Sequence, residues 1–157
     1  LAPSEMCIRD RGYVDHAACW VDVFGLKACP NLNGGRYKDL TAKDLEGNKY
    51  ERHHLISSHA LKETKAPKVS DSKIHREGIC VRLTPEEHAK TNNFGPGKKA
   101  NLQRQHEVDM IQSGRRNELM SEQIRDVQNI TTERDEGLLQ AWLADRARPD
   151  WKPDRLF

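Results

Sequence analysis

The chain has few cysteines and no long apolar run. Its four cysteines, Cys7, Cys19, Cys29 and Cys80, include no Cys-x-x-Cys pair. That absence argues against a thiolate zinc site and against a zinc deaminase, and the wide spacing does not resemble a disulfide framework. No apolar stretch approaches the roughly 20 residues that cross a bilayer. We therefore expect a protein without a membrane segment that works in a reducing compartment.

An excess of charge of one sign is also lacking, because the net charge is only +2 over 157 residues. The charge is unevenly spread, however, since residues 36–99 hold 14 Lys and Arg against 9 Asp and Glu. A local excess of this size allows a polyanionic partner without demanding one. The length suits one domain with a buried core better than two domains.

The stretch GICVRLTPEEH, residues 78–88, gives the clearest local signals. Ile79–Leu83 is β-branched and apolar enough for a strand. Thr84 then supplies a helix N-cap, Pro85 the first helical position, and Glu87 the second half of a capping box. This stretch predicts a strand followed directly by a capped helix.

Histidines occur beside both expected strands. An extended segment that starts at Tyr50 runs into the adjacent pair His53 and His54, and His88 lies in the first turns of the capped helix. Asn92 follows one helical turn later, on the same face. The alternative interpretation is that these histidines are solvated surface residues. It would have to apply to the adjacent pair and to His88 at the same time.

The remaining segments predict loops and helices. Tyr37–Leu40 is expected to be extended, Leu61–Arg76 to be a basic surface loop, and the capped helix to end near Gly95. From residue 98 onward the apolar residues recur at helical spacing in three helices, the last capped by Thr132. The residues expected to pack in the core are Leu102, Met110, Ile111, Leu119, Met120, Ile124, Val127, Leu138, Leu139, Trp142 and Leu143.

The fold class that follows is α+β, with a small β-hairpin and helix and a helical C-terminal half. This arrangement suits a particular chemistry. A hard divalent cation that is held by only two or three side chains keeps positions open for a phosphate oxygen and for water. A neighbouring imidazole with a pKa near neutrality can remove a proton from that water.

The order of these elements resembles the HNH, or His-Me finger, nucleases. The resemblance implies that His54 is the general base and His53 a metal ligand, with the reverse assignment open. It also implies His88 as the second ligand and Asn92 as a candidate third. The implied cofactor is a divalent ion, Mg²⁺ first, with Zn²⁺, Mn²⁺ and Ni²⁺ as alternatives.

A closer resemblance is to the C-terminal toxin domains of Rhs-type polymorphic toxins. It rests on the order of HHLISSHAL, GICVRLTPEEHAKTNNFG, LQRQHEVDMIQSG and LMSEQIRDV. These segments are similar to an H-H-x-P element, a G-P-x-I-x-M segment leading to D-H-x-x-T-x-S-x-G, and a downstream helix with Arg. Two positions depart from the pattern, since Ile56 replaces a proline and Glu87 replaces an aspartate.

The N-terminal residues are set apart from this domain. Met6–Arg11, MCIRDR, resembles the translation of a transposon end used in sequencing-library adapters. Asp22 and Phe24–Leu26 resemble the D-P-x-G-L junction that ends an Rhs core, with Val23 in place of the proline. The expected division is a remnant over 1–26 and a toxin domain over 27–157, within which 50–97 is the HNH-like core and 98–148 is helical.

The resemblance implies a metal-dependent endonuclease toxin that hydrolyses phosphodiester bonds in nucleic acid, DNA rather than RNA. It further implies delivery by an Rhs-type shell as a secreted effector that acts in the cytoplasm of a target cell, and a cognate immunity protein. The expected substrate contacts are Arg104, His59 and Lys90, with Glu87 and Thr91 as further candidates. Two alternatives stay open: a metal-independent, histidine-based toxin enzyme such as an RNase, and a non-enzymatic binding module stabilised by metal.

Overall fold

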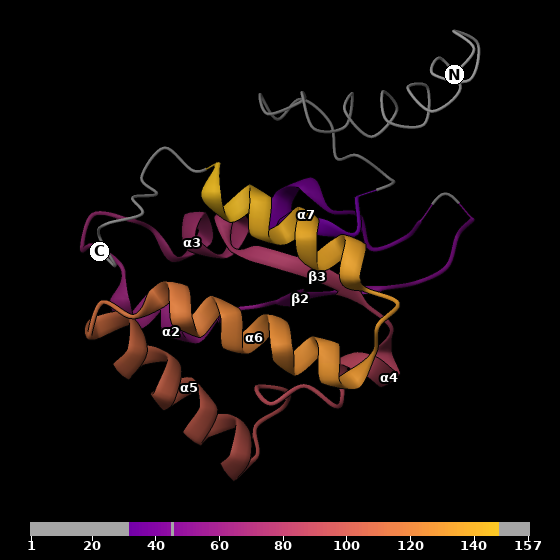
Figure 1. The fold of residues 1–157 in the computed structure, drawn as a ribbon. Coiled ribbons are helices and arrows are strands. Elements are labelled where there is room, and N and C mark those ends of the chain that lie inside the picture. The colour runs from indigo at the N-terminus through magenta and orange to yellow at the C-terminus, as the bar shows by residue number, and fades with distance from the viewer. Residues whose placement is uncertain (1–31, 45, 148–157) are drawn as a thin grey trace, which may run out of the picture.

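The computed structural model describes residues 32–44 and 46–147, which form an α+β structure (Figure 1). Three strands, β1 (Gly34–Arg36), β2 (Glu51–His54) and β3 (Ile79–Leu83), pair antiparallel in the order β1-β3-β2. All five residues of the central strand β3 are buried. The predicted α+β class is confirmed. The expected junction and the adapter-like start lie outside the described residues.

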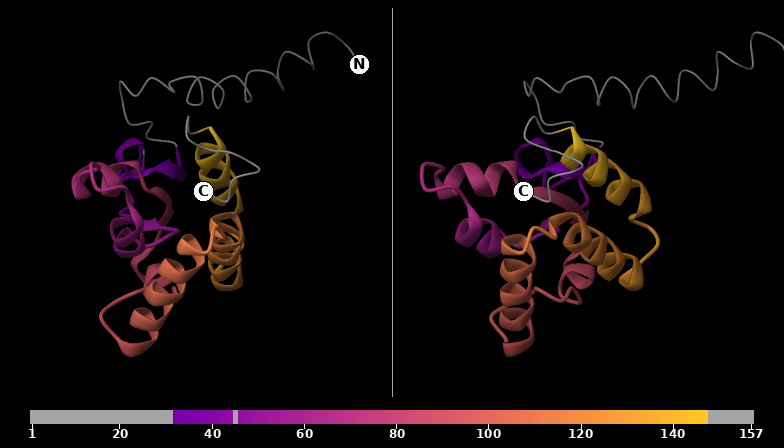
Figure 2. Two further views of the ribbon diagram at one scale, coloured as in Figure 1. Left: turned by 90° about the vertical axis from the view of Figure 1, so that its left-hand side faces the viewer. Right: turned by 60° about the vertical axis from the view of Figure 1, so that its left-hand side comes forward.

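A 3-10 turn and six helices accompany the sheet in the described ranges. They are η1 (Tyr37–Asp39), α2 (Ser58–Thr64), α3 (Asp71–Glu77), α4 (Pro85–His88), α5 (Lys98–Gln112), α6 (Arg116–Ile130) and α7 (Asp135–Arg146). Helix α7 packs against β1 and β3, α2 against α5, and α3 against η1. Figure 2 shows α6 and α7 on one side of the sheet and α2 and α3 on the other. None of these helices is long and apolar enough to cross a membrane.

The core lies between the sheet and helices α6 and α7. From β3, Ile79, Val81 and Leu83 point into it, and the helices add Leu119, Met120, Val127, Leu138 and Ala141. Two of the expected core residues are in fact exposed, Leu102 by 63% and Leu139 by 56%. In α7 the buried face is formed by Leu138, Ala141 and Asp145, so Leu139, one residue round the helix, points to solvent.

Glycines bring β1 and α7 into backbone contact. A Cβ atom at Gly34 would lie 1.7 Å from the carbonyl oxygen of Gly137, so neither strand nor helix could approach as closely with a larger residue. The Oε1 atom of Gln140 accepts hydrogen bonds from the amides of Asn33 (2.9 Å) and Gly34 (3.0 Å). The C-terminal helix is thereby fixed to the sheet that carries the histidine pair.

The region between β2 and β3 contains two helices separated by a turn over 65–70, so the prediction of one loop over 61–76 is wrong. The Ser57 hydroxyl accepts a hydrogen bond from the amide of Ala60 and starts α2. The Ser70 hydroxyl does the same for the amide of Lys73 and starts α3. Two serine N-caps therefore outweigh the high polarity of this segment.

The capping box at Thr84 is confirmed. Its hydroxyl accepts from the amide of Glu87 at 3.2 Å, and the Glu87 carboxylate accepts from the amide of Thr84 at 2.8 Å. Three boundaries differ from prediction. Helix α4 ends at His88 instead of near Gly95, the last helix begins at Asp135 behind a turn at Thr132, and the segment from Tyr37 forms a 3-10 turn instead of a strand.

Candidate active site

The adjacent histidines of β2 lie on opposite faces of the sheet. His53 pairs with Val81 of β3 and His54 with Cys80, and successive side chains of a strand point to opposite sides. His53 shares the face of Val81, which belongs to the core. His54 therefore points away from the α6 and α7 layer. The two histidines take part in two different clusters.

The first cluster joins β2 to the end of α4. The rings of His53 and His88 meet edge to face, with their centroids 5.0 Å apart. The Nδ1 atom of His88 also contacts the carboxylate of Glu51, which lies two residues before His53 on the same face of β2. His53 is buried, whereas the side chains of Glu51 and His88 are 47% and 22% exposed. Two imidazoles and a carboxylate thus meet at a surface that solvent can reach.

The position of His88 follows from the capping of α4. The capping box starts the helix directly after β3, and the amide of His88 donates to the carbonyl of Thr84 at 2.9 Å. Because α4 packs against both β2 and β3, its last residue is held beside β2. A helix of only four residues therefore suffices to place this imidazole.

Burial keeps the His53 imidazole neutral. Removal from water lowers the pKa of His53 to about 3, with smaller contributions from the nearby His88 and His54. At neutral pH its ring therefore carries a lone pair on one nitrogen. A metal ligand has to be deprotonated, so His53 is ready to bind a cation without first losing a proton.

The second cluster surrounds His54 on the other face. Its ring stacks on Tyr37 of η1, with centroids 5.1 Å apart, and lies 4.7 Å from the ring of His75 in α3. The Nε2 atom of His54 lies 3.0 Å from the carbonyl oxygen of His75 and donates to it. That donation puts the proton on Nε2 and leaves the lone pair on Nδ1. Burial lowers the pKa of His54 to about 4.

Gly78 makes room for the His54 ring. A Cβ atom at this position would lie 2.5 Å from Cδ2 and 2.8 Å from Nε2 of His54. The backbone of Gly78 has an ordinary extended conformation, with φ −60° and ψ 140°. The glycine is therefore required by the close approach of the imidazole and not by its dihedral angles.

Asn92 lies beyond the end of α4 and is tied to α6. The Asp126 carboxylate accepts hydrogen bonds from the backbone amide of Asn92, at 2.9 Å, and from its side-chain nitrogen. The side-chain oxygen, which is the atom able to bind a cation, takes no part in this contact. The structure therefore fixes the direction of Asn92 through Asp126.

Two further candidates have clear structural contacts. Glu87 accepts from the amide of Thr84 and from the Nε atom of Arg134, at 2.8 and 3.0 Å, which ties α4 to the start of α7. Thr91 is buried, and its hydroxyl donates to the carbonyl of His88 at 2.8 Å. Both residues therefore hold α4 and its last residue in place.

The three expected substrate contacts lie in different places. Arg104 of α5 donates to the carbonyl oxygens of Asn93 and Gly95 in the segment between α4 and α5. His59 is exposed on α2, and Lys90 is exposed in the turn that follows α4. Of the three, Lys90 is nearest in sequence to His88, and Arg104 shapes the loop next to it.

The first cluster shares one feature with histidine metal sites. Metal-binding histidines commonly hold a carboxylate with the second ring nitrogen, which is the relation between His88 and Glu51. That contact uses Nδ1 and leaves Nε2 of His88 for a further partner. Within the described ranges, no three His, Cys, Asp or Glu side chains are arranged to hold a metal ion. What the cluster does contain is two neighbouring imidazoles, His53 and His88, with the Glu51 carboxylate behind His88.

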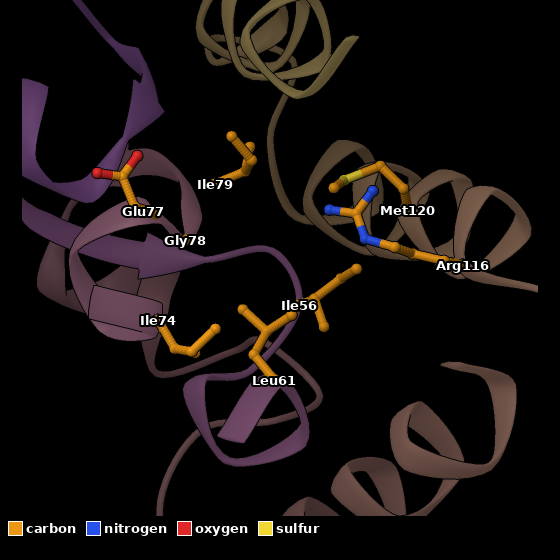
Figure 3. Close-up of a pocket in the computed structure, with 8 residues that line it drawn as sticks. All are labelled: Ile56, Leu61, Ile74, Glu77, Gly78, Ile79, Arg116 and Met120. Carbon is orange, nitrogen blue, oxygen red and sulfur yellow. The ribbon is translucent and has the colours of Figure 1, made fainter. Parts of the chain in front are cut away.

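A cavity of about 60 Å³ is lined by none of the residues of this cluster (Figure 3). Its lining is mostly apolar and is formed by Ile56, Leu61, Ile74, Glu77, Gly78, Ile79, Arg116 and Met120. That volume holds a few water molecules but no nucleotide. The cavity lies among α2, α3, β3 and α6, and we assign it no substrate.

Comparison with family models, with curated proteins and with solved structures gives no match for this chain. One residue of the first cluster, Glu51, is absent from the set expected from the sequence. The alternation of β2 could have identified it, because a residue two positions before His53 must share its face.

Proposed function

We propose that the domain is a metal-dependent endonuclease that hydrolyses phosphodiester bonds in nucleic acid, DNA in preference to RNA. The observation that carries the proposal is the convergence of Glu51, His53 and His88 at the junction of β2 and α4. The order strand, strand, helix with histidines at these positions also suits the resemblance to His-Me finger nucleases. The metal site and the activity are both proposals.

In this account His53 and His88 bind one divalent cation, and Glu51 orients His88. Such a cation stabilises the negative charge that develops on the scissile phosphate. His53 is neutral and buried, so it presents a fixed lone pair. Asn92, held by Asp126, remains the candidate third ligand through its side-chain oxygen.

His54 remains the proposed general base. Its tautomer is set by the His75 carbonyl, which leaves Nδ1 able to accept a proton. The pKa of about 4 makes it a weaker base than an ordinary imidazole, although it is fully deprotonated at neutral pH. His54 faces the side of β2 opposite to His53, so in this account the base and the cation act from different faces of the strand.

The exposed cations of α2 and α3 give the substrate phosphates a place to bind. Lys68, Lys73 and Arg76 are exposed in this region, and Lys62 is partly so. Lysine and arginine side chains bind the nucleic acid backbone without reading its sequence. The resemblance to Rhs-type toxins adds a delivered effector acting in a target cell, with an immunity protein as its partner.

Nicking of supercoiled plasmid by the full 157-residue chain tests this function. We expect cleavage with Mg²⁺ or another divalent ion, loss of cleavage in EDTA, and loss in His53→Ala and His88→Ala. His106→Ala is the matched control, because that histidine is exposed on α5 and pairs with Glu122 at the surface, and it should cleave like the wild type. A wild-type protein that leaves both DNA and RNA intact with every divalent ion would refute the proposal.

A second candidate function follows from the contact between Glu51 and His88. A carboxylate that holds one nitrogen of an imidazole prepares the other nitrogen for general acid and base catalysis without metal. RNA, whose 2′-hydroxyl supplies an internal nucleophile, is the substrate that such a centre could cleave. Cleavage of RNA that persists in EDTA and is lost in His88→Ala would favour this candidate.

A further inference from the structure

Phe94 is an exposed aromatic residue beside the proposed reaction centre. It lies between α4 and α5, and 45% of its surface is accessible, whereas most large apolar residues of the described chain are buried. Its ring meets the ring of His88 edge to face, with centroids 5.0 Å apart and an interplanar angle of 71°. The proposed cation ligand His88 therefore has one aromatic neighbour on the core side, His53, and another on the solvent side.

The backbone on both sides of Phe94 is held in place. The guanidinium of Arg104 donates to the carbonyl oxygens of Asn93 and Gly95, the residues that flank it. The side chain of Asn93 donates to the buried carboxylate of Glu107 at 3.4 Å. Contacts with α5 thus hold the backbone on both sides of Phe94 and keep its ring exposed. Arg104 is a positioning residue for Phe94.

Polar residues and lysines flank Phe94 along the chain. Its neighbours in sequence, from Asn92 to Gly97, are amides, glycines and a proline, and they form no apolar patch of the kind that marks a protein interface. Lys90, Lys98 and Lys99 flank this segment and are exposed. A rigid aromatic face among cations is the arrangement that binds unpaired bases and their phosphates in single-stranded nucleic acid.

We propose that Phe94 stacks an unpaired nucleobase of the strand whose phosphate lies at His53 and His88. This assignment rests on the proposed nuclease function. It makes the substrate at the site a single-stranded or locally opened segment, and it assigns the phosphates on either side to Lys90, Lys98 and Lys99. Because every base has an aromatic face, the contact selects unpaired bases without selecting a sequence.

Binding of a fluorescein-labelled 12-nucleotide single strand, measured by anisotropy in EDTA, tests the inference without cleavage. The second ligand is a strand of the same length in which the central nucleotides are abasic. We expect Phe94→Ala to raise the Kd for the normal strand about tenfold, which is about 1.4 kcal/mol and within the range for stacking on an aromatic side chain. The Kd for the abasic strand should hardly change.

Two controls complete the design. Phe94→Trp should keep wild-type affinity, because a larger aromatic face still stacks, and Leu102→Ala, at another exposed apolar residue, should also bind normally. Equal affinity of wild type and Phe94→Ala for the normal strand would overturn the inference. So would an equal loss for both strands, which would indicate a structural effect.

This experiment separates the inference from the function on which it rests. If the wild type cleaves plasmid with Mg²⁺ but Phe94→Ala binds the single strand as tightly as the wild type, the nuclease proposal stands and the stacking role of Phe94 is refuted. If Phe94→Ala weakens binding of the single strand but the wild type cleaves neither DNA nor RNA, the binding site stands and the nuclease proposal is refuted.

Discussion

The imidazoles of His53 and His88 lie edge to face across the junction of β2 and α4, with ring centroids 5.0 Å apart. One is buried and neutral, and the other is partly exposed and held by Glu51. This difference suits two ligands of one cation, because the buried ring fixes the position and the exposed ring leaves room for substrate.

Glu51→Gln should lower the rate of plasmid cleavage by about 10- to 100-fold. Groups that hold a metal-binding histidine typically have effects of this size on affinity or activity. The amide keeps the shape of the side chain but loses the charge that orients His88. Glu63→Gln, at an exposed position of α2, is the matched control. Unchanged cleavage by Glu51→Gln would remove this residue from the centre.

Gly78→Ala should reduce cleavage by displacing His54. A Cβ atom there would lie 2.5 Å from the His54 ring, so the imidazole must move. Cation binding by His53 and His88, on the other face of β2, should be retained. Gly97→Ala serves as control, because a Cβ at that position meets no atom within 4 Å. If Gly78→Ala folds stably and cleaves normally, His54 is not the base.

Acid should destabilise the fold through His53 and His54. Their pKa values are about 3 and about 4 in the folded chain and near 6.5 in the unfolded chain. Between those values the unfolded chain binds protons that the folded chain does not, so the free energy of unfolding falls as the pH drops below about 6.5. Each pKa unit contributes at most roughly 1.4 kcal/mol.

Urea unfolding in EDTA between pH 7.5 and 4.5 measures this dependence without competition from metal. His53→Gln should unfold with a shallower dependence on pH, since it removes one titrating group. His106→Gln is the control, because His106 is exposed and pairs with Glu122 at the surface. A wild-type stability that stays constant from pH 7 to 5 would contradict the burial argument.

Asp145→Ala should destabilise the domain by about 3–5 kcal/mol without touching the proposed centre. Asp145 is 1% exposed and forms a two-pronged ion pair with Arg116, at 2.8 and 2.6 Å, which joins α6 to α7. Removing the carboxylate leaves a buried cation without this partner. Glu118→Ala, which breaks an exposed pair with Arg115, should change thermal stability far less.

The sequence predicted those features that depend on neighbours along the chain. The capping box at Thr84 is a local hydrogen-bond pattern, and the strand before it is a run of apolar residues, so both could be identified. The serine caps of α2 and α3 are equally local, but the many charged residues of this segment are also typical of a solvated loop. Leu139 shows the limit of periodicity, since helical spacing does not say which face meets the core.

The contacts that build the candidate site are mostly long-range. Asp126 holds Asn92 from 34 residues away, and Glu51 reaches His88 only because α4 folds back onto β2. The separation of His53 from His54 follows from strand alternation alone, but the partners of each do not. No local pattern predicts that Tyr37 and His75 would enclose His54.

Calorimetric titration of a divalent ion into the metal-free protein tests the central claim most directly. We predict one cation bound per chain by the wild type and by His59→Ala. Binding should be lost or weakened at least tenfold in both His53→Ala and His88→Ala. A wild-type protein that binds no divalent ion, or variants at His53 and His88 that bind it as tightly as the wild type, would contradict the claim that these two histidines share one cation.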